Sequence, residues 1–273
     1  MPRLIQAVLA AAAVLLLLPP AAHAQPAPVV IADGHVDLGP RLVDGKWTVE
    51  IRDDTGDGPV WRNPSDVVLQ VADAAKTTVP DDPAYKFLGT PGGEVWVLPQ
   101  VQDPDVVWPG WNTQDPSIAD VVGREVDWRL LGVEGPGRFE LFLTGNFGTP
   151  ETIFSSERPY PQETGVEAGT HVHGNWVFTA PGAYSLDVEM ATADGRGDRA
   201  TLKVHVGPGD PATAFPTAEP STSPSGPAAA QPADTTAGRL PLVWIAAAGG
   251  VVVLAVATTL VVRSRRTAGR SND

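Results

Sequence analysis

The chain of 273 residues contains no cysteine. It therefore forms no disulfide and offers no thiolate as a nucleophile or as a metal ligand. These absences exclude the disulfide-stapled class of small exported proteins, and they exclude zinc sites built from cysteine. Any metal site must use nitrogen and oxygen ligands.

Basic residues are also scarce, with 19 Lys and Arg against 32 Asp and Glu and a net charge of −13. Nucleic-acid binding needs a basic surface, so nucleic acid is not an expected partner. The sequence has no serine nucleophile elbow, no HExxH motif and no glycine-rich phosphate loop. We therefore expect a protein that is not an enzyme.

Long apolar runs occur only at the two ends of the chain. Residues 1–24 have a basic residue, an apolar run and the sequence Ala22-His23-Ala24, which is the pattern of a cleaved signal peptide. Residues 240–262 carry no charge and are long enough to cross a membrane, and arginines follow in the tail, 263–273. This arrangement predicts a single-pass protein of the cell membrane with an extracellular ectodomain and a cytoplasmic tail. The alternative, a cleaved sorting signal, has the same shape but lacks an LPxTG-like pentapeptide before the span.

Residues 208–239 are rich in Pro, Ala, Ser and Thr and predict an extended, disordered linker. Residues 25–207 remain as one surface domain. Short runs there alternate apolar and polar residues, most clearly over 183–190, and Asp194-Gly195 predicts a hairpin turn before the run 202–206. We expect an all-β domain, an antiparallel β-sandwich.

Two histidine motifs have the same form. The sequence GHVD places His35 and Asp37 two residues apart, and GTHVHGNW does the same for His171 and His173. Side chains at i and i+2 of a strand point to one face, so each pair can converge on one ion. The four residues predict a transition-metal site, with zinc the favoured ion. The alternative is that they are surface polar residues of half-exposed strands.

Three other features have alternatives of their own. Residues 53–58 begin like a calcium loop, but Pro64 stands where the bidentate glutamate belongs, so an ordinary acidic turn is favoured. Trp108 and Trp111 lie in a predicted loop, where they could stack on a sugar or a planar ligand or could plug the core. We expect His205, on the polar side of its strand, to be exposed and outside the site.

Several longer stretches carry a family resemblance. They are GHVDLGPRLVDGKWTVEIRDD at 34–54, FLGTPGGEVWVLPQVQDP at 87–104, VWPGWNT at 107–113, GPGRFELF at 135–142 and GTHVHGNWVFTAPGAYSL at 169–186. Together they resemble the actinobacterial surface-anchored domain of choice-of-anchor M proteins. The resemblance implies an exported wall- or membrane-attached protein whose relatives are associated with ABC transporters of the metal-uptake type.

These observations predict a membrane-anchored cell-surface binding protein that holds a transition metal for an ABC-type importer. The alternative is a structural or adhesive module whose tryptophan loop contacts cell-wall polymer or glycan.

Overall fold

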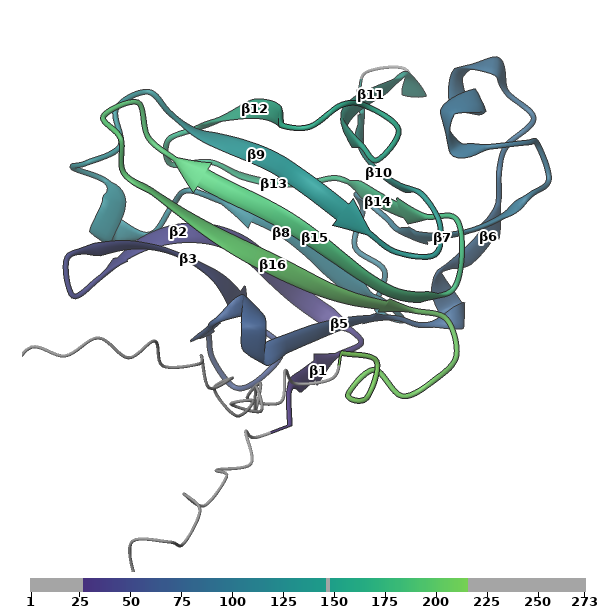
Figure 1. The fold of residues 1–273 in the computed structure, drawn as a ribbon, viewed down its shortest axis with the longest axis horizontal. Coiled ribbons are helices and arrows are strands. Elements are labelled where there is room, and N and C mark those ends of the chain that lie inside the picture. The colour runs from purple at the N-terminus through teal and green to yellow at the C-terminus, as the bar shows by residue number, and fades with distance from the viewer. Residues whose placement is uncertain (1–26, 146–147, 216–273) are drawn as a thin grey trace, which may run out of the picture. The chain divides into compact units, whose positions relative to one another are not determined.

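The computed structural model describes residues 27–145 and 148–215 (Figure 1). The expected signal peptide, membrane span, cytoplasmic tail and residues 216–239 of the linker lie outside these residues. Within the described residues, no helix is long and apolar enough to cross a membrane.

The described residues form a mostly β structure with three sheets. Four short 3-10 helices connect the strands; they are Pro64–Asp66, Asp73–Ala75, Pro83–Leu88 and Pro116–Ile118. The all-β expectation is confirmed at this level.

Sheet A has six strands in the order β1-β5-β16-β15-β9-β12. Their bounds are β1 Val29–Ile31, β5 Val67–Val71, β16 Gly197–Val206, β15 Gly182–Ala191, β9 Glu125–Glu134 and β12 Gln162–Glu167. β15 and β16 form the predicted hairpin, and Gly195 takes a positive φ of 93° in its turn. The alternation seen in the sequence places Tyr184, Leu186 and Val188 in the core.

Sheet B has five strands in the order β13-β8-β2-β3-β4. Their bounds are β13 His171–His173, β8 Val107–Asn112, β2 Gly34–Val43, β3 Lys46–Asp53 and β4 Val60–Arg62. β2 pairs with β8 in parallel, and β13 pairs with β8 antiparallel. Val36 and Leu38 of β2 are buried in the core, so His35 and Asp37, which alternate with them, belong to the other face of the sheet.

Sheet C is antiparallel, in the order β11-β10-β14-β7-β6. Its bounds are β11 Pro150–Ser155, β10 Phe139–Thr144, β14 Asn175–Phe178, β7 Glu94–Leu98 and β6 Lys76–Thr78. One face contributes to the main core, and the other packs a smaller apolar cluster that includes Leu88 and Phe142.

Tryptophan fills much of the main core. Trp128 is 1% exposed, and its ring centroid lies 4.9 Å from that of Trp111 and 6.3 Å from that of Trp176. The indole of Trp47 in β3 donates a hydrogen bond of 2.9 Å to the Met190 carbonyl in β15, which ties sheet B to sheet A. Trp176 and Phe178 are also buried.

Three expectations about these elements need correction. Antiparallel pairing holds throughout sheet C, but β5 pairs in parallel with both β1 and β16, and β2 pairs in parallel with β8. Residues 107–112 form strand β8 rather than a loop. His205 is 6% exposed: its ring bonds to the Gln70 side chain at 2.9 Å, and the segment after β16 lies against it, since a Cβ atom at Gly209 would be 3.1 Å from its Nε2.

Candidate metal centre

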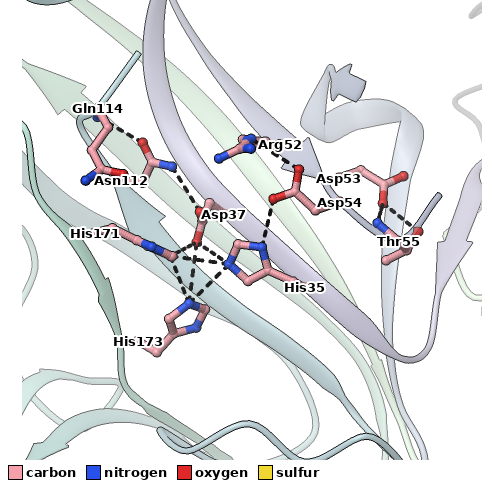
Figure 2. A network of polar contacts seen from close by, with 10 residues as sticks. All are labelled: His35, Asp37, Arg52, Asp53, Asp54, Thr55, Asn112, Gln114, His171 and His173. Atoms are coloured by element: carbon pink, nitrogen blue, oxygen red, sulfur yellow. Dashed lines mark hydrogen bonds and ion pairs between the residues drawn. The ribbon is translucent and has the colours of Figure 1, made fainter. Parts of the chain in front are cut away.

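The four residues predicted as metal ligands come together in sheet B, as Figure 2 shows. β2 contributes His35 and Asp37, and β13 contributes His171 and His173. β8 lies between these two strands, and its Gly110 pairs with Asp37 on one side and with His173 on the other. The centre is therefore assembled across three adjacent strands.

Gly110 leaves the space in which the ligands meet. A Cβ atom at this position would overlap the Asp37 carboxylate, would lie 2.7 Å from Cε1 of His173 and would crowd the Val172 carbonyl. Real Cβ atoms do not approach other atoms so closely, so no other residue fits without displacing two of the four ligands. The glycine is required for close side-chain approach.

Four ligand atoms converge on one point. Nε2 of His35 lies 3.3 Å from Nε2 of His171 and 3.2 Å from Nε2 of His173, and the last two atoms are 2.9 Å apart. Oδ1 of Asp37 lies 3.4, 3.0 and 3.9 Å from the Nε2 atoms of His35, His171 and His173, respectively. The four atoms thus form the corners of a slightly irregular tetrahedron.

Asp37 is held by a buried amide. Its side chain is fully buried, and its Oδ2 accepts a hydrogen bond of 3.0 Å from Nδ2 of Asn112. Oδ1 of Asn112 in turn accepts a bond from the Gln114 backbone N–H, which fixes the orientation of the amide. Oδ1 of Asp37 is left to face the three imidazoles.

His35 is held by a carboxylate. Its Nδ1 lies 2.8 Å from Oδ2 of Asp54, and Arg52 forms an ion pair with the other oxygen of Asp54 at 3.2 Å. Because the carboxylate accepts, Nδ1 carries a proton and Nε2 faces the cluster, where it can bind a cation once it has lost its own proton. This carboxylate–histidine arrangement is the usual support of a metal-bound imidazole.

His173 is held by packing. Its ring stacks on Trp108 with centroids 3.6 Å apart and planes at 10°. Trp108 is fixed in turn by a hydrogen bond of 3.2 Å from its indole N–H to the Gln100 carbonyl. Burial lowers the pKa of His173 to about 4, although the charge of Asp37 opposes the shift. The ring is therefore neutral near pH 7, as a metal ligand must be.

The pKa values of the β2 pair shift in opposite directions. The pKa of His35 is raised, chiefly by its hydrogen bond with Asp37, although burial opposes the shift. Burial works to raise the pKa of Asp37, but hydrogen bonds from His35 and Asn112 outweigh it and lower the pKa below its ordinary value. Asp37 is therefore a carboxylate at neutral pH, which suits binding to a cation.

The structure also places the other candidate residues. Trp111 is 4% exposed and packs in the core, whereas Trp108 lies against the histidines rather than in an open loop. Asp53 already bonds to Thr55 and to Arg62, and it therefore acts as a turn residue and an ion-pair partner, as the favoured alternative predicts.

Sequence reasoning identified the four converging residues and singled out Trp108, but it missed the supporting roles of Gly110, Asn112 and Asp54. The apolar residues of 107–112 are compatible with a strand, but Pro109 and Gly110 together indicate a loop. The loop signal therefore hid the position of Gly110 and Asn112 in the strand between the two ligand pairs. Comparison with known protein families and with curated proteins gives no match for this chain.

Proposed function

We propose that this chain is a cell-surface zinc-binding protein. The observation that carries the proposal is the tetrahedron of ligand atoms. A tetrahedron with edges of about 3.3 Å has its corners about 2.0 Å from its centre, which matches zinc–nitrogen and zinc–carboxylate bonds of ~2.0–2.2 Å.

The ligand chemistry supports the same ion. Three imidazoles and one carboxylate in tetrahedral array suit Zn²⁺, whereas Mn²⁺ prefers octahedral oxygen ligands and Cu²⁺ prefers a tetragonal arrangement. A cation also accounts for three Nε2 atoms facing one another, since their lone pairs would otherwise repel. Because the protein fills all four positions, the centre holds the ion as cargo or as a structural element, and no open position is left for catalysis.

The proposed role is to hold zinc outside the membrane for an ABC-type importer. It is supported by the resemblance to surface-anchored domains associated with metal-uptake transporters, and by the composition of the two chain ends. Four protein ligands give a bound ion protection from solvent, and its release then depends on exchange with another ligand.

Elemental analysis tests the proposal directly. The full chain, purified in detergent without a His-tag and dialysed after exposure to zinc at pH 7.5, is expected to retain close to one zinc per chain. The double variant His171→Ala, His173→Ala is expected to retain none. A matched control, Asp57→Asn, changes an exposed acidic side chain outside the cluster and is expected to bind zinc like the wild type.

Thermal unfolding, measured with and without zinc, is a second test of the same proposal. An ion that binds only the folded state stabilises it by about 2.7 kcal/mol when its concentration is 100 times Kd. A wild-type protein that retains no zinc and whose melting curve is unchanged by zinc would show that the proposal is wrong.

A further inference from the structure

The four ligands of the centre are not equally constrained. Asp37 is anchored by Asn112, His35 by Asp54, and His173 by stacking on Trp108. For His171, every hydrogen bond in the described part of the chain is made by Nε2, and each of them goes to another ligand. Within residues 27–145 and 148–215, therefore, no side-chain hydrogen bond from outside the cluster fixes the orientation of the His171 ring.

The ligand without an outside hydrogen bond or stacking partner among the described residues is also the most exposed of the four. The side chain of Asp37 is 0% exposed, that of His173 is 8%, that of His35 is 19%, and that of His171 is 31%. The centre thus opens to solvent on the side of His171. An incoming ligand reaches the ion there before it can reach any other coordination position.

The backbone that carries His171 lies at the edge of sheet B. β13 is a three-residue edge strand, and among the described strands it pairs only with β8. It begins two residues after Gly169, which has a positive φ of 75°. The residues before β13 are bonded to Thr113 at the end of β8, by Gly169 N–H to the Thr113 carbonyl and by Thr113 N–H to the Thr170 carbonyl, so exchange at His171 requires its side chain to turn rather than its strand to move.

We propose that His171 is the exchangeable ligand through which zinc leaves the centre. This inference rests on the zinc-binding function proposed above. An acceptor protein presents an imidazole or a carboxylate at the open side; the bond from zinc to its new ligand forms, and the bond from zinc to Nε2 of His171 breaks. His35, Asp37 and His173 hold the ion during this step, and no electron is transferred.

The partner that fits this site is therefore a metal acceptor with an accessible histidine or acidic side chain. A three-ligand centre with one open position is a stable arrangement for zinc, since catalytic zinc sites use it. Transfer through such an intermediate never releases the free ion.

Chemical rescue distinguishes the two histidines of β13. The Co²⁺ complex of the full chain serves as the probe, because tetrahedral Co²⁺ absorbs visible light. His171→Ala is expected to lose part of this absorption and to regain it when free imidazole is added, because the vacated position opens to solvent. His173→Ala, the matched control, is expected not to be rescued, because Trp108 covers that position.

The kinetics of zinc removal from the wild type give an independent reading. The rate is expected to rise in proportion to the concentration of a small chelator, as direct ligand exchange requires, and to be at least tenfold faster in His171→Ala. A rate independent of chelator concentration would refute the inference, even if the variants fail to fold. Equal rescue of both variants, or rescue of neither with wild-type binding intact, would also refute it. Failure of the wild type to bind either Co²⁺ or Zn²⁺ would instead overturn the proposed function.

Discussion

Glu140 is a buried carboxyl group that is not part of the candidate metal centre. Its ionisation should make the free energy of unfolding depend on pH. It lies in β10, is 1% exposed, and accepts one hydrogen bond of 2.9 Å at Oε1 from the Ser155 hydroxyl. Its Oε2 is buried with no hydrogen-bond partner among the described residues. Burial, reinforced by the charge of Glu157, raises the pKa of Glu140 from 4.5 to about 7.

The sign of the effect follows from proton binding. Between pH 4.5 and about 7 the folded chain keeps a proton on Glu140 that the unfolded chain has released. The stability present below pH 4.5 is therefore lost progressively as pH rises through this window, and the loss is complete above about pH 7. At about 1.4 kcal/mol for each pKa unit, the full loss is about 3 kcal/mol.

The substitution Glu140→Gln keeps the shape of the side chain and removes the ionisation. We expect it to raise the free energy of unfolding by about 1–3 kcal/mol at pH 8 and to change it little at pH 4.5. Urea unfolding of both proteins at the two pH values, with EDTA present to keep metal off, measures the difference. Glu151→Gln, an exposed change in the neighbouring strand β11, should shift stability by less than about 0.5 kcal/mol. An equal effect of Glu140→Gln at both pH values would refute the reasoning.

Three further predictions concern the centre and the chain ends. Gly110→Ala should abolish zinc binding, measured by elemental analysis, because its Cβ would occupy the space of two ligands; a variant with full zinc content would contradict this. Asn112→Ala should weaken zinc binding about 10–100-fold in competition with a chromophoric chelator, because it frees Asp37 to turn, and unchanged affinity would count against that support. A tag placed after Asp273 should survive protease treatment of intact cells while the ectodomain is digested, and loss of the tag would reverse the proposed topology.

The centre could be predicted from sequence because each ligand pair is local. His35 with Asp37, and His171 with His173, share a face by the two-residue period of a strand, whatever the rest of the fold. What brings one pair to the other is β8, and its parallel pairing with β2 has no signature in the sequence, since alternation is the same in parallel and antiparallel strands. Proline and glycine in β8 indicated a loop. In the structure, the absence of a side chain at Gly110 lets the side chains of Asp37 and His173 approach each other across β8.

The same reasoning explains the misplacement of His205. Its alternation with Leu202 and Val204 correctly placed it on the polar face of β16, but only the three-dimensional structure shows that Gln70 and the segment around Gly209 lie against its ring. The alternation of apolar and polar residues shows on which face of a strand a residue lies. It does not show whether another segment of the chain packs on that face.

The distance along the chain between the two ligand pairs has a consequence for when the ion can bind. His35 and His171 are separated by 136 positions, so a chain still emerging from a ribosome or a translocation pore holds only the first pair. The complete ligand set exists only after β13 has joined its sheet. Any ion that the four residues hold would therefore be taken up in the compartment in which folding finishes, and under the proposed function a chain exported unfolded would meet zinc for the first time outside the cytoplasm.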